Sequence, residues 1–384
     1  MIPLDLEEVR SYGTGMPEEH YDWVIVGSGL GGSVSASLAK KTPSPSDAQR
    51  DITFSTAPLG PLGYAGEPNC AELALVSTSQ TSQEHVCSYY QLGGFSCWSL
   101  ARHSSSAMAA LGITIRQMPD IDVNGVRLHY VDQGSGSEAV VFSHSYLVDW
   151  SHFKPQIDAL SGRYRCIAFD HRGHGASERP KAGYDMENIY EDAIALIEAI
   201  GCAPVHFVGL STGGFIGLRL GFRRPDLLRT LTLMDTSAEA EPVSNRVQYE
   251  LMMRMIRVVG MRPFARYITS LFFSKNLRRH PTHQAEVGRF RQMIASDDKD
   301  AMIRFGRGIF GRQSVTEQLA EIEVPTLVIV GEKDKSQPPA RAKRMADGIP
   351  NSQLLIVPNA AHISNFDGAE LVTAALERHL AQHV

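Results

Sequence analysis

Apolar and polar positions follow no regular pattern over the first third of this chain. Segment 42–117 is rich in Ser, Thr, Pro, Gly and Ala and holds neither strand nor helix periodicity for long. A segment of this kind buries too little apolar surface to offset the entropy cost of ordering it. We therefore expect residues 42–117 to be largely irregular and poorly ordered, with a short helix near 98–111.

The pattern changes at Met118. Two strand-like runs flank Asn124-Gly125, a dipeptide typical of a tight hairpin turn. Short apolar runs then alternate with helical patterns, which indicates parallel strands buried on both faces and covered by helices. The expected strands are 139–144, a run starting at 165 that ends in a polar loop, 204–211, 228–237, 325–332 and 353–358. The expected helices are 149–161, 187–200, 213–224, 338–349 and 367–382.

A long helical stretch, 243–315, interrupts this alternation before the last two strands. The order of elements predicts an α/β fold with a mostly parallel sheet and helices on both faces.

Composition is that of a soluble globular protein. The chain has 384 residues, of which 43% are hydrophobic and 21% charged, with a net charge of -5. Nothing in these totals indicates nucleic acid or an anionic membrane as a partner. No apolar run approaches the roughly 18 residues that span a bilayer, and the acidic first twenty residues do not resemble a secretory signal. The five cysteines form no C-x-x-C pair, so we expect reduced thiols and a cytoplasmic protein.

Residues 21–41 contain a glycine-rich loop, "WVIVGSGLGG", after an apolar run and before a segment of helical character. That order suits a dinucleotide-binding turn, and the stretch resembles the amino terminus of glucose–methanol–choline-type flavoproteins. Such a site also needs an acidic residue at the end of a second strand, roughly 20 residues on. Asp51 instead begins a short apolar run. We expect no bound dinucleotide, and a flavin-dependent oxidoreductase is the disfavoured alternative.

The strongest chemical signal is "VGLSTGG", residues 208–214, between an apolar strand and an apolar helix. Gly209 and Gly213 allow the sharp strand-to-helix turn that raises a nucleophilic Ser211 above the sheet. The same turn places the N–H of Thr212 at the start of a helix, where it faces a developing oxyanion.

A serine nucleophile needs a base and a carboxylate that orients the base. His362 and Asp334 follow the last two expected strands, in the order serine, acid, histidine. Asp235, at the end of the preceding strand, is the alternative acid. Asp170 and Asp185 are weaker candidates, and Asp170 is expected to organise its own loop.

The loop after strand 139–144 is expected to supply a second oxyanion donor. We assign this role to the backbone N–H of Tyr146, whose side chain could also line the pocket. For His144 and Ser145 we favour packing and loop shape.

From Met118 onward the chain resembles the α/β-hydrolases, especially their esterase, enol-lactonase and non-haem haloperoxidase-like group. The resemblance rests on "FSHSYLVDW", "FDHRGHGASERP", "GLSTGG", "VGEKDKSQPP" and "VPNAAHIS", all in the expected order. The departures are Ser145 where Gly is usual after the histidine, and Ala361 where Gly is usual before His362. Having Ser at position 211 argues against the haloalkane dehalogenases and epoxide hydrolases of this fold, which use a carboxylate nucleophile.

The resemblance implies a serine hydrolase that cleaves small to medium carboxylic esters or lactones through an acyl-enzyme, without metal or organic cofactor. C–C bond hydrolysis and perhydrolysis are alternatives on the same triad. A hydrolase-fold scaffold without activity is disfavoured because all three triad positions are filled.

The resemblance further implies a helical cap over the site at about 240–318, inserted after the sixth strand. The candidate pocket residues are Ser145, Trp150, Met252, Phe264 and Phe272. Residues 245–315 carry fourteen Arg and Lys against five Asp and Glu. Steering of an anionic substrate and a solvated charged face are both open interpretations of this surplus.

We expect two parts in the chain. Residues 1–117 are an extension, and 118–384 form a complete hydrolase domain joined to it. The expected partner is a small-molecule ester or lactone, and the expected assembly is a monomer or homodimer.

Overall fold

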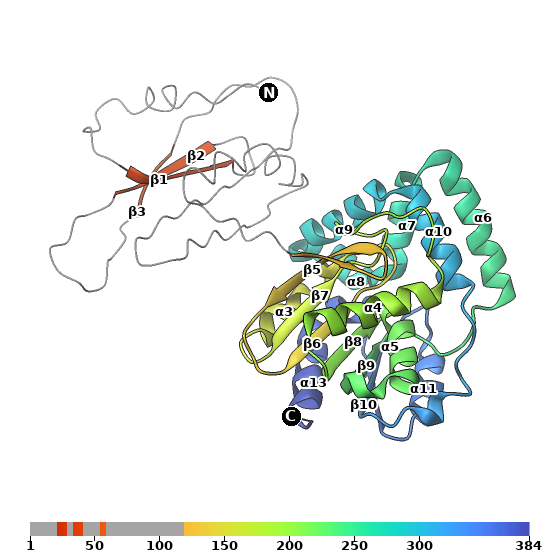
Figure 1. The fold of residues 1–384 in the computed structure, drawn as a ribbon. Helices are drawn as coiled ribbons and strands as arrows, with labels where there is room; N and C mark the ends of the chain where they lie inside the picture. Colours follow the sequence, from red (N-terminus) through yellow and green to blue (C-terminus); the bar gives the residue numbers. More distant parts are fainter. Residues whose placement is uncertain (1–20, 29–33, 41–53, 59–118, 384) are drawn as a thin grey trace. The chain divides into compact units, whose positions relative to one another are not determined.

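The computed structural model describes residues 21–28, 34–40, 54–58 and 119–383. The chain divides into two compact units, 1–117 and 118–384, and each is described by itself. The first unit contains an antiparallel sheet of order β1-β2-β3 (Figure 1). Its strands are β1 (Tyr21–Ser28), β2 (Val34–Lys40) and β3 (Phe54–Pro58).

This small sheet corrects two expectations from the sequence. The segment after the glycine loop is a strand, and Val26 pairs with Ala36 in an antiparallel hairpin. Val34, Ala36 and Leu38 alternate with serines, a period of two that suits a strand better than the helix we expected. The strand–loop–helix geometry of a dinucleotide site is therefore not formed, and the resemblance to a flavoprotein fragment is not supported. Strand β3 likewise lies in a segment expected to be irregular; the order of the rest of 42–117 and the expected helix near 98–111 lie outside the described residues.

The second unit is built on an eight-stranded sheet of order β11-β10-β9-β8-β6-β7-β5-β4. The first two strands form the expected hairpin about Asn124-Gly125, and β5 pairs antiparallel with β7. The remaining pairs are parallel. The strands are β4 (Asp120–Val123), β5 (Val126–Gln133), β6 (Ala139–Ser143), β7 (Arg165–Phe169), β8 (Val205–Leu210), β9 (Leu228–Met234), β10 (Thr326–Gly331) and β11 (Ser352–Val357).

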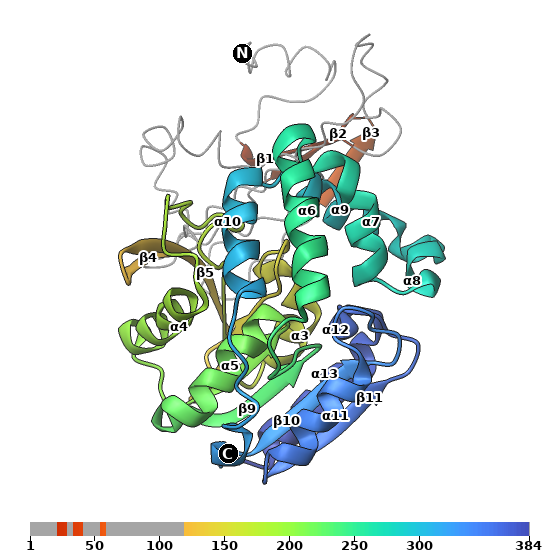
Figure 2. The same ribbon diagram turned by 90° about the vertical axis from the view of Figure 1, so that its right-hand side faces the viewer.

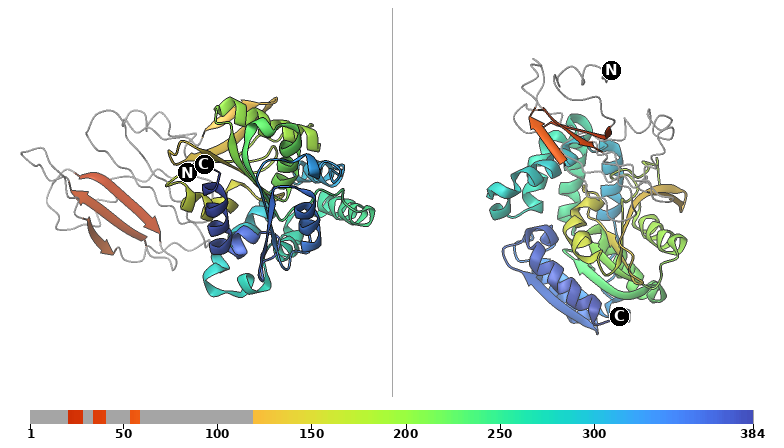
Figure 3. Two further views of the ribbon diagram at one scale, coloured as in Figure 1. Left: turned by 90° about the horizontal axis from the view of Figure 1, so that it is seen from below. Right: turned by 90° about the vertical axis from the view of Figure 1, so that its left-hand side faces the viewer.

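Helices cover both faces of this sheet, as Figure 3 shows in an edge-on view. Helices α4, α5 and α11 pack on one face, while α3 and α13 pack against each other on the other face. Every residue of β6, β8 and β10 is buried, which explains their nearly continuous apolar sequences. The helices are α3 (Lys154–Leu160), α4 (Met186–Ile200), α5 (Thr212–Arg223), α11 (Pro339–Gly348), α12 (Ser364–Asp367) and α13 (Ala369–Ala381).

The expected cap is present between β9, the sixth strand of this unit, and β10. Figure 2 shows its helices stacked above the carboxyl ends of the strands, with α6 and α10 side by side. The cap helices are α6 (Val243–Val259), α7 (Arg262–Phe272), α8 (Lys275–Arg279), α9 (Gln284–Ser296) and α10 (Lys299–Phe310). Short 3-10 turns complete the unit: η1 (Trp150–Phe153), η2 (Pro225–Leu227), η3 (Pro281–His283) and η4 (Leu319–Glu321).

Within the described part of the chain, none of the helices combines the length and the apolar character needed to cross a bilayer.

Candidate active site

Ser211 occupies a strained turn between β8 and α5. Its backbone has φ 53° and ψ -103°, a conformation that L-residues rarely adopt. A Cβ on Gly209 would overlap the backbone of Gly213, and a Cβ on Gly213 would overlap the carbonyl of Ser143. These two glycines are therefore required for the strand and helix to approach this closely, as the sequence predicted.

A continuous hydrogen-bond chain joins Ser211, His362 and Asp334. The Ser211 hydroxyl donates to Nε2 of His362 over 3.1 Å, and Nδ1–H of His362 donates to Oδ2 of Asp334 over 2.8 Å. All three side chains are buried. The structure thus brings together three residues that lie 151 and 28 positions apart along the chain.

Asp334 and Asp235 lie near each other but have different hydrogen-bond partners. The second oxygen of Asp334, Oδ1, accepts from the backbone N–H of Ser336 and Gln337, which fixes the carboxylate with Oδ2 toward the histidine. Asp235 instead accepts from the backbone N–H of Gly331 and from Ser364 through its N–H and hydroxyl. Its carboxylate therefore connects the loops that carry the other two groups.

The other two acidic candidates lie elsewhere. Asp170 accepts from the backbone N–H of Ala176 in its own loop and from that of Trp150. Asp185 caps the amino end of α4 by accepting from the N–H of Asn188.

The buried charges around His362 act in opposite directions. Burial lowers the pKa of the imidazole, but the charge and hydrogen bond of Asp334 and the charge of Asp235 raise this pKa above its ordinary value of 6.5. Burial, together with the charge of Asp334, raises the pKa of Asp235 to about 8. The environment therefore stabilises a positive charge on His362, which is what a histidine that accepts a proton needs.

The two backbone groups assigned to the oxyanion lie on adjoining loops. Thr212 is the first residue of α5, and Tyr146 lies in the loop after β6. These loops are joined by a hydrogen bond from the N–H of Gly213 to the carbonyl of His144. Neither Thr212 nor Tyr146 donates a backbone hydrogen bond to another group among residues 119–383.

Two histidines of the loop after β7 support the Tyr146 loop, and sequence reasoning missed them. The backbone N–H of His171 donates to Nε2 of His144, and the N–H of Leu147 donates to Nε2 of His174. Burial lowers the pKa of His171 to about 4, so the ring is neutral at physiological pH. The sequence feature that could have indicated them is the pair of histidines in "FDHRGHG". This segment follows β7, which pairs with β6, the strand before His144. The ring of His144 contacts the Ser145 carbonyl and the His171 N–H, which fits the role in packing and loop shape that we favoured for it.

The side chain of Tyr146 connects the loop after β6 to the cap. Its hydroxyl donates to the carbonyl of Met302 over 2.6 Å, and its ring stacks on Phe305, both on α10. A Cβ on Gly306 would lie 2.8 Å from this hydroxyl, so the helix passes very close to the tyrosine.

The candidate pocket residues have different surroundings. The ring of Phe272 lies 5.8 Å from that of His362, and its carbonyl accepts from the N–H of Ile363. Ser145 is fully buried, and its hydroxyl has no hydrogen-bond partner among residues 119–383. Trp150, Met252 and Phe264 are partly buried and pack against the hydrophobic core. Their role in a pocket stays a prediction.

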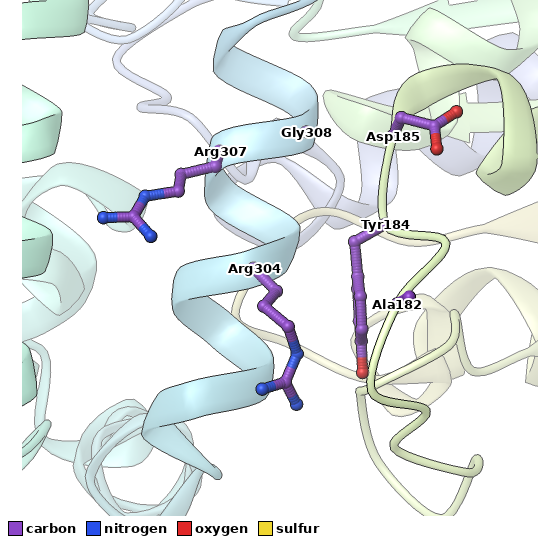
Figure 4. A pocket seen from close by; sticks show the side chains of 6 residues that line it. All are labelled: Ala182, Tyr184, Asp185, Arg304, Arg307 and Gly308. Atoms are coloured by element: carbon purple, nitrogen blue, oxygen red, sulfur yellow. The ribbon is translucent and has the colours of Figure 1, made fainter.

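A surface hollow of about 380 Å³ lies at the seam between α10 and the segment before α4 (Figure 4). Arg304 projects from α10 beside Tyr184, with its guanidinium 5.2 Å from the centre of the tyrosine ring, whereas Arg307 projects from the other side of the helix. None of the residues of the serine–histidine–aspartate chain lines this hollow. Over the described residues, no three His, Cys, Asp or Glu side chains are grouped so that they could hold a metal ion.

Comparison with known proteins identifies the fold family of the chain. The sequence pattern of the α/β hydrolase fold matches residues 138–369. "Putative carbamate hydrolase RutD" of Agrobacterium fabrum is 28% identical over 240 residues, which cover 60% of this chain and 88% of the relative. The enol-lactonase of Burkholderia xenovorans LB400 is 28% identical with a TM-score of 0.64, covering 68% of this chain and 100% of its own. A thermophilic esterase of Thermogutta terrifontis is 27% identical with a TM-score of 0.65, covering 70% and 100%. The chain belongs to the α/β-hydrolase fold family.

Proposed function

We propose that the protein is a serine hydrolase that cleaves carboxylic esters or lactones through an acyl-enzyme. The observation that carries this proposal is the unbroken hydrogen-bond chain from Ser211 through His362 to Asp334, with the serine on a strained turn. An enol-lactonase and an esterase among the similar solved structures support the substrate class.

In the first half of the reaction, Ser211 Oγ attacks the acyl carbon while Nε2 of His362 takes the hydroxyl proton. The N–H groups of Tyr146 and Thr212 stabilise the oxyanion of the tetrahedral intermediate. The bond from the acyl carbon to the leaving oxygen then breaks, and the imidazolium gives its proton to that oxygen. In a lactone the leaving alcohol stays attached to the acyl group.

In the second half, neutral His362 takes a proton from water, whose oxygen attacks the acyl carbon. The second intermediate collapses when the bond from the acyl carbon to Ser211 Oγ breaks and the imidazolium returns its proton to that oxygen, which releases the acid. Asp334 holds the imidazole in the tautomer with hydrogen on Nδ1 and stabilises its positive charge in both halves.

Substitution of the nucleophile tests the proposal directly. Ser211→Ala should reduce turnover of a short p-nitrophenyl ester by about 10⁶-fold, while the melting temperature stays near the wild-type value. Ser270→Ala, on cap helix α7 with its hydroxyl donating to the Tyr267 carbonyl, is the matched control and should keep full activity. Activity retained by Ser211→Ala would show that another group is the nucleophile.

The acid is tested by a pair of variants of equal size. Asp334→Asn should lower kcat by about 10⁴-fold, because the amide no longer holds the required tautomer. Asp235→Asn changes a carboxylate that contacts Gly331 and Ser364 instead of the histidine, so its kcat should fall far less. A larger loss in Asp235→Asn would reverse the assignment.

The substrate class is tested with esters, lactones and carbamates of matched acyl length. We expect the highest kcat/KM among the esters or lactones. The alternatives on the same triad are scored in the same series, by hydrolysis of a vinylogous diketone for C–C cleavage and by peracid formation from acetate and hydrogen peroxide. A clear preference for either alternative would replace the proposed substrate class and leave Ser211 as the nucleophile.

A further inference from the structure

Cap helix α6 presents an apolar face to solvent. Val243, Val247, Leu251 and Val258 are 73%, 63%, 59% and 81% exposed. Their spacing of four, four and seven residues places them on one side of the helix. A ridge of four aliphatic side chains therefore extends along the helix, which lies at the outer edge of the cap in Figure 1.

This ridge is not the face that holds α6 on the protein. Met253 and Ile256 are each 3% exposed and fix the opposite side of the helix to the hydrophobic core. Since Met253 and Ile256 already attach the helix, the exposed apolar face buries little surface and is not needed to hold α6 in the cap. Apolar faces of this kind on surface helices mark interaction sites.

Arg246 and Arg257 border the ridge, and Arg254, seven residues after Val247, lies within it. Arg246, Arg254 and Arg257 lie on α6, and neither Arg246 nor Arg257 has an ion-pair partner within residues 119–383. From 243 to 279, across α6 to α8, the chain has eight Arg and Lys and one acidic residue, Glu250. A groove of about 770 Å³ lies beside the ridge between α6 and α10, and it is lined by Val243, Val247, Leu251, Arg246, Arg254 and Arg307 among others.

We propose that this face of α6 binds an anionic lipid surface, with the aliphatic ridge among the acyl chains and the arginines at the phosphates. Helices with one aliphatic and one basic side lie in the plane of such an interface without spanning the bilayer. Basic residues near an anionic surface contribute to binding in proportion to their number.

Charge argues against a second copy of the chain as the occupant. A two-fold dimer would place this face against itself, so the three arginines of α6 would meet three others with one carboxylate, Glu250, from each copy. The net charge of the whole chain is negative and by itself indicates no anionic membrane partner. That total sums the charges of all 384 residues, so it hides the local charge of α6. On this one face the sign is reversed.

Vesicle co-sedimentation of the full chain is the first test. We expect binding to phosphatidylcholine vesicles that contain phosphatidylserine, and at least tenfold weaker binding to phosphatidylcholine alone. Binding should weaken as salt is added, because surface charges are screened. Equal binding to both vesicles, or none to either, would overturn the proposal.

Paired variants then locate the contact. Arg246→Gln with Arg257→Gln should weaken binding about 25-fold, roughly fivefold for each charge lost. The control, Arg163→Gln with Arg378→Gln, removes the same charge from exposed positions outside the cap and should change binding less than threefold. Similar losses in both double variants would mean that only total charge matters and would overturn the assignment to α6.

The apolar ridge has its own pair. Val247→Ser with Val258→Ser should weaken binding by on the order of tenfold or more per residue. Ile356→Ser with Leu371→Ser, at exposed positions outside the cap, should leave binding unchanged. All four variants should hydrolyse a water-soluble ester at the wild-type rate, which shows that they are folded. A wild-type dimer in light scattering that Val247→Ser with Val258→Ser dissociates would identify a second copy as the occupant and overturn the lipid proposal.

Discussion

Asp334 and Asp235 illustrate what single residues contribute to this site. Both follow strands that are neighbours in the sheet, β10 and β9, so both carboxylates reach the same edge. Asp334 has one oxygen held by two backbone N–H groups and the other on His362. Asp235 has both oxygens occupied by Gly331 and Ser364. The local partners of each carboxylate therefore favour Asp334 over Asp235 as the proposed orienting acid.

The shifted pKa of His362 predicts a pH dependence. The base must be neutral to accept the serine proton, and its pKa is raised, so kcat/KM should rise with pH through a midpoint above 6.5. In Asp334→Asn the charge and hydrogen bond of Asp334 that raise this pKa are gone, while the burial that lowers it and the charge of Asp235 that raises it remain. In this variant the acid limb of the kcat/KM profile should lie at lower pH than in the wild type, and the plateau value of kcat/KM should be lower.

Rate profiles from about pH 5 to 9 measure this shift. Asp158→Asn, at an exposed carboxylate that pairs with Lys154, is the control and should leave the limb in place. An acid limb at the same pH in Asp334→Asn and wild type would contradict the assignment of the limb to His362.

Tyr146 gives a second prediction at this scale. Tyr146→Phe removes the hydrogen bond to the Met302 carbonyl and frees the loop that carries an oxyanion N–H. Since loss of a whole oxyanion donor costs about 10²- to 10³-fold in kcat, a misplaced one should cost about tenfold, with KM changed less.

The matched control is Tyr164→Phe, because the buried Tyr164 hydroxyl has no hydrogen-bond partner among residues 119–383. It should keep full activity. An equal loss of kcat in both variants would mean that Tyr146 does not position the loop.

The candidate site could be predicted from sequence as far as chain order allows. Ser211, Asp334 and His362 each follow a strand, and parallel strands bring their carboxyl ends to one edge. The contacts of His171 and His174 could not be predicted in the same way. These contacts depend on the distance between the loops after β6 and β7, which the β6–β7 pairing sets, and on the rotamers of the two histidines.

Among the cap helices, α10 contacts the sheet domain closely at two places. A Cβ on Gly308 would overlap the carbonyl of Tyr184, and Gly306 faces the hydroxyl of Tyr146. Two glycines on one helix thus allow it to contact both the segment before α4 and the oxyanion loop.

Two helical glycines of the cap provide a matched test of this contact. Gly308→Ala should destabilise the protein by about 1–3 kcal/mol, because the new methyl group forces the helix away from Tyr184. Gly288→Ala, on α9 with open space around it, should stabilise it by about 0.5–1 kcal/mol through helix propensity. Denaturant unfolding measures both, and equal stability of the two variants would contradict the tight contact.

Periodicity predicted the elements of 118–384 and failed before them. Strands such as β8 and β10 are continuous apolar runs that match the expected ranges within about two residues. Segment 34–40, with its small residues, was given the wrong element. Small side chains give weak amphipathic signals, so hairpin pairing with β1 decided its conformation instead.

At the scale of the domain, charge is separated between the cap and the rest. Fourteen basic and five acidic residues lie in 245–315, above the catalytic edge of the sheet. If this field steers substrates, kcat/KM of a carboxylate-bearing ester should fall steeply with added salt, while that of a neutral ester of equal size should hardly change.

Parallel measurements of the two esters between low and moderate ionic strength decide between steering and a solvated charged face. Equal salt responses would exclude steering and leave the surplus without a role in substrate capture.

The basic cap has one more consequence. Residues 118–384 carry thirty-one basic and thirty-one acidic side chains, so nine surplus positive charges on the cap are balanced by nine surplus negative charges on the remainder. This part of the chain is thus neutral in total yet carries a large electric dipole moment. Near its isoelectric point it should bind to a cation exchanger through the basic cap and to an anion exchanger through the acidic remainder. In the field of any charged surface it would rotate before it makes contact, so the approach to a negative one is cap first.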